Sequence, residues 1–330
     1  MARGRIGGLT IVALTTWIGG CTPTGGFKVM PIPADLSLQE RVVLRDPSWT
    51  SRRVALIDIS GILMNAHEPG FFSEGEHPVS FAVEKLAAAE ADSRVRAVVL
   101  RINSPGGTVT ASDTIYEEIL AFKKRSGKPV VAYFQDVAAS GAYYLACAAD
   151  EIIAQRTSVT GSIGVIMQMF DFSETMSKIG VRTDAITSGP YKDAGSPLRP
   201  MTPKEREVFQ GLVDHFYEQF VKVVDAGRSD ISTEQVANLA NGQVYSAREA
   251  LDLGMIDRIG TLHDAIEAAK RRANIKSAHT VIYDRPLGWS PNIYAQNSPP
   301  VAQNIQFFAI NLPNIWTRTP RFLYIWSGER

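Results

Sequence analysis

The chain has 330 residues, of which 45% are hydrophobic and 21% charged, a composition typical of a globular protein. Lys+Arg and Asp+Glu each number 34, and because no basic stripe stands out, we expect no nucleic-acid partner. The five histidines are scattered and neither CxxC nor HExxH spacing occurs, so the sequence gives little support to a metal enzyme.

The N-terminus has the pattern of a signal peptide. Two arginines precede an apolar stretch over residues 6–18, which is short for a membrane-spanning helix of about 20 residues. The stretch leads into Ile18-Gly-Gly-Cys21, which is similar to the lipobox of bacterial lipoproteins. We therefore predict a lipoprotein signal peptide over residues 1–20, with Cys21 lipidated and anchoring the protein to a membrane. An ordinary signal peptide with a chance cysteine, or an uncleaved short anchor, would fit the same residues.

The second cysteine, Cys147, has no expected disulfide partner if Cys21 carries lipid. It lies in the apolar run Tyr143-Tyr-Leu-Ala-Cys-Ala-Ala149. Neither a histidine nor a charged residue flanks it immediately, so we interpret it as a small buried hydrophobic residue rather than a nucleophile.

The first half of the chain alternates apolar strands with helices. Residues 21–51, with several Pro, Gly and Thr residues, are predicted to be a tether. The predicted strands cover residues 53–60, 96–102 and 129–134, and the predicted helices cover 78–91, 111–125 and 139–149. Because continuous apolar strands alternate with helices, we predict an α/β fold with largely parallel strands.

The second half is predicted to be mostly helical. A strand over Val181–Ile186 is followed by a loop of turn-forming residues. Helical structure is predicted over residues 203–226 and over most of 233–273.

The composition changes after the helical region, so we expect one domain over residues 52–284. The tail over residues 285–330 is rich in Pro, Asn, Gln and aromatic residues. It could be a mobile extension, or an aromatic strand that docks on a neighbour or a membrane surface.

Two predicted strand ends are rich in glycine, Asn103–Gly107 and Ala138–Ala142. Ligands of parallel sheets gather at the carboxyl ends of the strands. Adjacent glycines allow backbone N–H groups to turn toward a ligand, and two converging N–H groups form an oxyanion hole. A tight turn without a ligand is the alternative for Pro-Gly-Gly.

Ser140 is the candidate nucleophile. It opens a predicted helix, whose N-terminus places partial positive charge and free N–H groups beside the hydroxyl. The alternative is an N-cap serine without catalytic function. No Gly-x-Ser-x-Gly elbow surrounds Ser140 and no histidine follows closely, which weakens a Ser-His-Asp scheme, and no Ser-x-x-Lys occurs.

A lysine can act as the base where burial or cationic neighbours lower its pKa. The candidates are Lys178, Lys192 and Lys204. Lys192 lies in a loop that follows a predicted strand, and loops on rigid strands commonly carry function. The alternative is a solvated surface charge, as most lysines are.

At these residues the sequence resembles the signal peptide peptidase A family, also called protease IV, over residues 52–283. The resemblance implies a ClpP/crotonase-like α/β fold with repeated β-β-α units and a helical C-terminal part. The motifs occur in the family's order: Arg101-Ile-Asn-Ser-Pro-Gly-Gly107, Ala138-Ala-Ser-Gly-Ala-Tyr-Tyr144, Thr160-Gly-Ser-Ile-Gly-Val165, Tyr191-Lys-Asp193 and Ala250-Leu-Asp-Leu-Gly-Met-Ile-Asp257.

The resemblance also implies the site. Ser140 would be the nucleophile, Lys192 the general base and Ser162 the hydroxyl that orients the lysine. The backbone N–H groups of Gly107 and Gly141 would form the oxyanion hole, and no cofactor is implied. The activity implied is that of a serine endopeptidase cleaving signal-peptide remnants or other small-residue-rich peptides.

The expected partners and location follow from the same resemblance. It implies a homo-oligomeric ring in which serine and lysine of one site come from neighbouring protomers. With the lipidated Cys21, we expect a membrane-anchored protein of the bacterial cell envelope, facing the periplasm or extracytoplasmic side. Two alternatives stay open: a non-catalytic envelope ring or scaffold of the same fold, and a crotonase-type acyl-CoA enzyme, against which the export signal and the serine at the helix start both argue.

Overall fold

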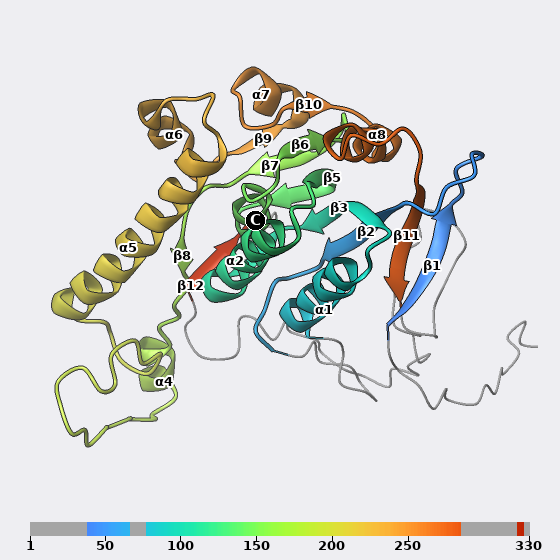
Figure 1. Ribbon diagram of the computed structural model, residues 1–330. Helices are drawn as coiled ribbons and strands as arrows, with labels where there is room; N and C mark the ends of the chain where they lie inside the picture. Colours follow the sequence, from blue (N-terminus) through green and yellow to red (C-terminus); the bar gives the residue numbers. More distant parts are fainter. Residues whose placement is uncertain (1–37, 67–76, 285–321, 327–330) are drawn as a thin grey trace, which may run out of the picture. The chain divides into compact units, whose positions relative to one another are not determined.

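A largely parallel β-sheet forms the centre of the described structure. The computed structural model describes residues 38–66, 77–284 and 322–326. The central strands are successive parallel neighbours (Figure 1): β2 (Arg53–Ser60), β3 (Val95–Ser104), β5 (Val130–Ala139), β6 (Glu151–Ala154) and β10 (Arg258–Ile259). The α/β class predicted for a ClpP/crotonase-like fold is therefore confirmed.

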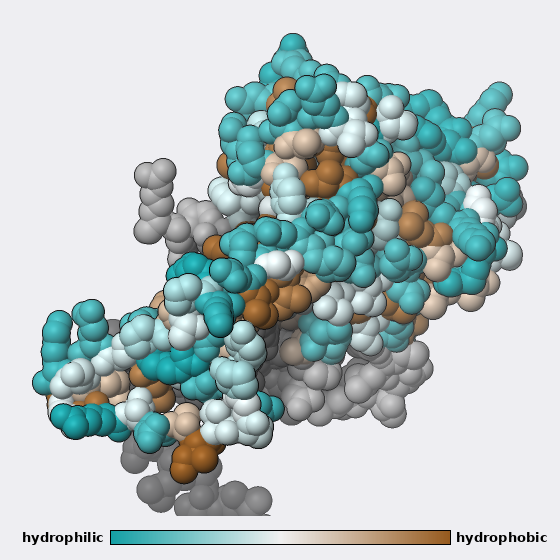
Figure 2. Space-filling view, turned by 90° about the vertical axis from the view of Figure 1, so that its left-hand side faces the viewer, coloured by the Kyte–Doolittle hydropathy of each residue, from teal (hydrophilic) through white to brown (hydrophobic). Residues whose placement is uncertain are grey.

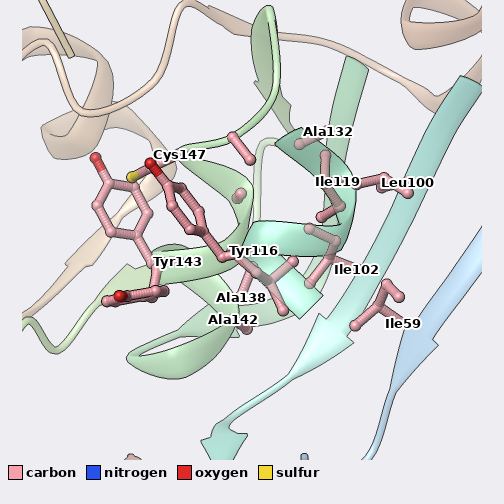
Figure 3. Packing of buried hydrophobic residues seen from close by; sticks show 14 of the residues in the cluster. Ile59, Leu100, Ile102, Tyr116, Ile119, Ala132, Ala138, Ala142, Tyr143 and Cys147 are labelled. Carbon is pink, nitrogen blue, oxygen red and sulfur yellow. The ribbon is translucent and has the colours of Figure 1, made fainter. Parts of the chain in front are cut away.

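The central strands are apolar on both faces because helices cover both faces. In β2, Ala55 and Ile57 belong to one hydrophobic cluster, whereas Val54 and Leu56 belong to another. Among the helices that contribute residues to the first cluster are α1 (Pro78–Ala91), α2 (Val109–Ser126) and α3 (Gly141–Ala146). Figure 3 shows part of it, where side chains of the strands approach Ile119 of α2. The second cluster contains residues of α8 (Leu262–Arg272), so the sheet is buried on both sides.

Local sequence signals fix where the helices begin. The Thr108 side chain accepts a hydrogen bond from the Ala111 N–H at the start of α2, and Gly127 ends that helix in the left-handed conformation. Reciprocal Thr/Ser and Glu/Gln/Asp capping boxes open four further helices: α5 (Pro203–Gly227), α6 (Thr233–Leu239), α7 (Ala247–Asp252) and α8.

The folded domain begins earlier than residue 52. Within the predicted tether of residues 21–51, β1 (Gln39–Leu44) pairs antiparallel with β11 (His279–Asp284), which pairs parallel with β2. The tether prediction is therefore wrong for these residues. The physical reason is the run Val42-Val-Leu44, whose side chains pack against both hydrophobic clusters.

One other expectation needs correction in the second half. Val181–Ile186 is not a strand: both named residues are exposed, and the segment pairs with none of the strands in the described ranges. The region 233–273 is mostly helical, as predicted, with two short strands, β9 (Val244–Ser246) and β10, between its helices. β9 pairs antiparallel with β7 (Val159–Gly161), which itself extends the end of β5 in parallel.

A second, three-stranded sheet contains part of the C-terminal tail. Its order is β4 (Gly106–Thr108), β12 (Phe322–Ile325) and β8 (Ile166–Met167), and both pairings are antiparallel. Figure 1 shows β12, in red, beside β8 and α2. The sequence left open whether the tail is a mobile extension or a docking strand, and these four residues form a strand that docks on the chain's own domain.

The predicted signal peptide over residues 1–20 and the lipidation site Cys21 lie outside the described residues, as does most of the predicted tail. Among the residues that the structure describes, none of the helices combines the length and the apolar character that crossing a bilayer requires.

Candidate active site

Two strands of the main sheet end side by side at the candidate site. β5 leads into Ser140 and β7 leads into Ser162, and their last residues, Ala139 and Gly161, are register partners. The Ser140 N–H donates a hydrogen bond to the Gly161 carbonyl oxygen at 2.7 Å. The structure therefore brings the predicted nucleophile and the predicted orienting serine together at one end of the sheet.

Both serines have strained backbones. Ser140 has φ 55° and Ser162 has φ 50°, and only one other non-glycine residue of the described ranges, Asn274, has a positive φ. Such conformations cost roughly 1–3 kcal/mol each, and persist only where the surroundings impose them. Here the Tyr144 N–H donates to the Ser140 carbonyl oxygen at 2.9 Å and the Ser162 N–H donates to the Gln243 carbonyl oxygen at 2.7 Å. Strain of this kind clusters at functional sites.

The Ser140 hydroxyl does not cap a helix. Ser140 occupies the N-cap position of α3, but its side chain accepts no capping hydrogen bond, and the residue is only 1% exposed. An ordinary N-cap serine uses its oxygen to accept a bond from the first turn of the helix. Within the described part of the chain, the hydroxyl is therefore buried at a helix start without this structural role.

The two glycine-rich segments meet beside Ser140. A methyl group placed on Gly106 would lie 2.7 Å from the Gly141 nitrogen, so β4 lies directly against the start of α3. A methyl group on Gly141 would lie 2.2 Å from the Ser112 Oγ, and one on Gly107 would lie 1.9 Å from the Leu63 carbonyl oxygen. No side chain fits at these positions, so the backbone approaches the site as closely as glycine allows. This arrangement suits attack on a carbonyl group, with amide N–H groups near the developing oxyanion.

Lys192 is not beside Ser140 within one protomer. It lies in the segment between α4 (Ser173–Lys178) and α5, which Figure 1 shows apart from the sheet. Its side chain is exposed, and none of the hydrogen bonds of the described residues joins it to Ser140. The other two candidates, Lys178 and Lys204, are also exposed on this part of the chain. We call residues 168–212 the arm.

A charged network ties the Lys192 segment to the start of α5. The Arg199 Nε lies 2.7 Å from an Asp193 carboxylate oxygen, and its Nη1 donates to Glu205 at 3.0 Å. Glu205 also accepts a hydrogen bond from the Thr202 N–H at 2.8 Å as part of the capping box of α5. The hydrogen bond with Arg199, followed by that with Thr202, lowers the pKa of Glu205 to about 2. The pKa of Asp193 is also lowered, chiefly by its hydrogen bond with Arg199.

Sequence reasoning missed this network and the aromatic cluster next to the site. The Thr202-Pro-Lys-Glu205 capping signal was available, but nothing in the sequence connects Arg199 to both carboxylates. The aromatic cluster joins Tyr144 of α3 to Tyr324 of the tail, with ring centroids 5.2 Å apart. A contact between residues 180 positions apart has no local signal.

Cys147 is a buried structural residue, as the sequence predicted. It lies in the hydrophobic cluster at the end of α3 (Figure 3) and is 4% exposed. Burial raises the pKa of its thiol to about 12, so the thiol stays protonated and is not a nucleophile.

Comparison with known proteins identifies the family of this chain. Residues 122–276 match the model of peptidase family S49. The putative protease MJ0651 of Methanocaldococcus jannaschii is 36% identical over 65% of this chain and 68% of its own length. A putative signal peptide peptidase SppA of Enterococcus faecium is 32% identical over 71% of this chain and 67% of its own length. Among solved structures, the membrane-bound stomatin-specific protease 1510-N aligns with 66% of this chain and 84% of its own, at TM-score 0.42 and 15% identity.

The first two relatives share both substantial identity and most of their length with this chain, and they agree with the family match. The chain therefore belongs to peptidase family S49 and is a serine peptidase of the signal peptide peptidase A type.

Proposed function

We propose that the protein is a serine endopeptidase of the bacterial cell envelope that uses a Ser-Lys dyad. Its substrates would be signal-peptide remnants or other small-residue-rich peptides at the membrane. The observation that carries the proposal is Ser140: a buried hydroxyl on a strained backbone, free of a capping role, beside two glycine-rich segments. Membership of family S49 and the predicted signal peptide with Cys21 support the activity and the location.

The proposed reaction is acyl transfer to Ser140. Neutral Lys192, oriented by Ser162, accepts the hydroxyl proton as the Ser140 oxygen attacks the peptide carbonyl. The N–H groups of Gly107 and Gly141 stabilise the oxyanion, a contribution of roughly 3–4 kcal/mol per donor in comparable enzymes. Lys192 then returns the proton to the leaving amine, and a water molecule, deprotonated by the same lysine, hydrolyses the acyl-enzyme.

Because Lys192 lies apart from Ser140 in the protomer, we propose that each dyad forms between neighbouring protomers of a homo-oligomeric ring. Nine of the twelve large hydrophobic residues that the described chain exposes lie in the arm: Phe170, Phe172, Ile179, Val181, Ile186, Tyr191, Leu198, Val208 and Leu212. Figure 2, which faces the side of the arm, shows such hydrophobic residues among hydrophilic ones. Concentrated exposed hydrophobic residues are typical of an interaction surface, and a second copy would bury them while delivering its lysine.

Labelling with a serine-directed fluorophosphonate probe tests this proposal. We expect the probe to attach covalently to Ser140 in the wild-type protein, located by mass spectrometry of a proteolytic digest, and to leave Ser140→Ala unlabelled. An intact oligomer without any labelling at Ser140 would instead support a non-catalytic ring or scaffold of the same fold.

The Arg199 network supplies a second prediction. Arg199→Ala should lower kcat/KM for peptide hydrolysis about 10–100-fold, because the segment carrying Lys192 loses its tie to α5 and the amine is misplaced. The kcat/KM of Arg199→Lys should lie between those of the wild type and Arg199→Ala, since a lysine keeps the positive charge but not the bidentate geometry. Arg182→Ala, which changes another exposed arm arginine, is the matched control and should retain full activity.

The pH dependence of the network has a defined sign. The pKa values of Asp193 and Glu205 are both lowered in the folded protein, so these carboxylates stabilise the fold fully at pH values above their ordinary pKa. The stabilisation declines as the pH falls. For Glu205 it is lost between pH 4.5, the ordinary pKa of the group, and about pH 2, its pKa in the folded protein.

A normal kcat/KM in Arg199→Ala would show that the network does not position Lys192.

A further inference from the structure

The edge of the main sheet that lies opposite Ser140 is formed by four segments, each of which leads into a parallel strand. Residues 45–53, 92–96, 123–130 and 270–279 lead into β2, β3, β5 and β11, respectively. Parallel strands begin at one edge of a sheet and end at the other, and Ser140 directly follows the carboxyl end of β5. We call the four segments the basic edge.

Hydrogen bonds join the basic edge into one continuous surface. Each of three bonds links two neighbouring segments: the His279 N–H donates to the Arg52 carbonyl oxygen at 3.0 Å, the Arg53 N–H to the Arg94 carbonyl oxygen at 2.7 Å, and the Lys128 amine to the Asp92 carbonyl oxygen at 2.9 Å. More than 200 positions separate the first segment from the last in the sequence. The fold therefore gathers charges that form no stripe in the linear sequence.

The basic edge has far more positive than negative residues. It contains 13 Lys and Arg residues but only two acidic residues, Asp46 and Asp92. Because the whole chain has 34 residues of each sign, the rest of the chain has 21 basic and 32 acidic residues. The charge of this formally neutral chain is therefore strongly polarised toward the edge opposite Ser140.

Ion pairs within the basic edge engage both of its acidic residues. An Asp46 oxygen lies 3.4 Å from the Lys270 amine, and an Asp92 oxygen lies 2.9 Å from an Arg94 nitrogen. Carboxylates of adjoining segments pair four further basic residues of the edge: Arg53, Lys123, Arg125 and Arg272.

The charges that remain at the basic edge are all positive. Six basic residues are exposed and have no carboxylate within salt-bridge distance in the described ranges: Arg45, Arg52, Arg96, Lys124, Arg271 and Lys276. An exposed surface of this kind attracts anions without first having to break ion pairs of its own.

Trp49 stands at the tip of the basic edge, between Arg45 and Arg52. Its relative exposure of 106% is the highest among the large hydrophobic residues that the structure describes. Figure 1 shows its loop, in blue between β1 and β2, projecting from the body of the domain. The loop is held at its base, where the Asp46 N–H donates to the Nδ1 of His279 at 2.9 Å. Indole rings are enriched at the boundary between lipid headgroups and water.

We propose that the basic edge binds the surface of a membrane rich in anionic phospholipids, with Trp49 inserted among the headgroups. The six unpaired basic residues complement the phosphate groups, and each contributes about a fivefold gain in affinity near an anionic surface. A tryptophan exposed between basic residues favours a lipid surface over an acidic polypeptide, because the ring gains an apolar phase to enter.

Membrane contact at the basic edge would turn Ser140, at the other edge of the sheet, toward the aqueous phase. Peptides would then reach the site after leaving the bilayer. The inference goes beyond the proposed function and does not depend on it, since the basic edge contains none of the proposed catalytic residues.

Vesicle binding by the full chain tests the inference. The chain carries Cys21→Ser, which removes the predicted lipid, and its affinity is measured by co-sedimentation with phosphatidylcholine vesicles that contain either no phosphatidylglycerol or about 30% of it. We expect the anionic vesicles to be bound at least ~100-fold more tightly than the neutral ones. Raising the salt from about 0.1 M to about 1 M should remove most of this preference, because the screening length falls from about 10 Å to about 3 Å.

Two matched triple variants separate the position of the charge from its amount. The first replaces three unpaired residues of the basic edge: Arg45→Gln, Arg52→Gln and Lys276→Gln. The second replaces three exposed basic residues elsewhere: Arg182→Gln, Arg206→Gln and Lys222→Gln. The first should weaken binding to the anionic vesicles about 100-fold, and the second should change it less than about twofold. None of the six side chains makes a hydrogen bond or ion pair within the described residues, so both variants should fold, which thermal melting checks.

Trp49→Ala should weaken binding to the anionic vesicles about fivefold while keeping its salt dependence. Equal affinities of the two triple variants, or equal affinity of the parent chain for neutral and anionic vesicles, would overturn the inference. Binding to poly-glutamate in place of vesicles would also overturn it, by identifying an acidic polypeptide as the partner. Failure of the proposed peptidase function has a different signature, because Ser140 would then stay unlabelled by the fluorophosphonate while binding to anionic vesicles persisted.

Discussion

Replacing Ser140 by alanine is expected to lower kcat for peptide hydrolysis at least ~10⁴-fold, the scale seen when a serine peptidase loses its nucleophile. The physical reason is that no acyl-enzyme forms, so only binding and the oxyanion donors remain. The backbone of Ser140 is held by its bonds with Gly161 and Tyr144, which the substitution keeps, so the fold and the oligomer should be retained. Turnover of a fluorogenic peptide measures the loss of kcat, and size-exclusion chromatography in parallel shows whether the oligomer is retained.

Ser158 provides the matched control. It is another buried serine, just before the start of β7, but its hydroxyl donates to the Phe134 carbonyl oxygen at 3.0 Å and has a structural role. Ser158→Ala should cost about 1 kcal/mol of stability and leave kcat unchanged. If Ser140→Ala kept turnover close to that of Ser158→Ala, the identification of the nucleophile would be wrong.

Replacing Lys192 by alanine is expected to lower kcat about 10³-fold or more, because the serine then lacks a general base and the leaving amine a general acid. Lys192→Arg should be equally inactive, since a guanidinium keeps the charge but does not give up its proton. Lys178→Ala, which changes another exposed lysine of the arm, should remain active. Activity in Lys192→Arg would indicate that position 192 acts only through its charge.

Much of the fold could be predicted because its signals are local. The strand over 53–60 and the helix over 78–91 have the bounds that apolar runs and turn residues indicated. The two glycine-rich strand ends were expected to meet, and Gly106 does lie against Gly141. Sequential apolar strands in a parallel sheet bring their ends to one edge, which is why this part of the site was accessible from the sequence.

Features that depend on distant pairing could not be predicted in this way. β1 has ordinary strand residues, but its partner β11 lies about 240 positions later. Without that partner in view, the sequence predicted a tether for this segment. Val181–Ile186 has the apolar residues of a strand but pairs with none of the strands among the described residues. Tyr324 is one of several aromatic residues of the tail, and nothing local in the sequence indicates that its ring packs against Tyr144 and Phe220.

The position of Lys192 differs from expectation only in its local setting, because the resemblance already implied that Ser140 and Lys192 of one site come from neighbouring protomers. The sequence placed it on a loop carried by a rigid strand, whereas it lies exposed on the arm, apart from Ser140 of the same chain. A catalytic role for this lysine therefore requires a neighbouring protomer, which the exposed hydrophobic residues of the arm would help to bind.

Co-assembly of the two inactive variants decides whether nucleophile and base come from different chains. Ser140→Ala and Lys192→Ala chains are co-expressed with different affinity tags, mixed oligomers are isolated through both tags, and peptide turnover is measured. Random mixing leaves about one quarter of the interfaces with an intact serine facing an intact lysine, so turnover should recover to about 25% of wild type. Mixed oligomers as inactive as either parent would contradict a site shared between protomers.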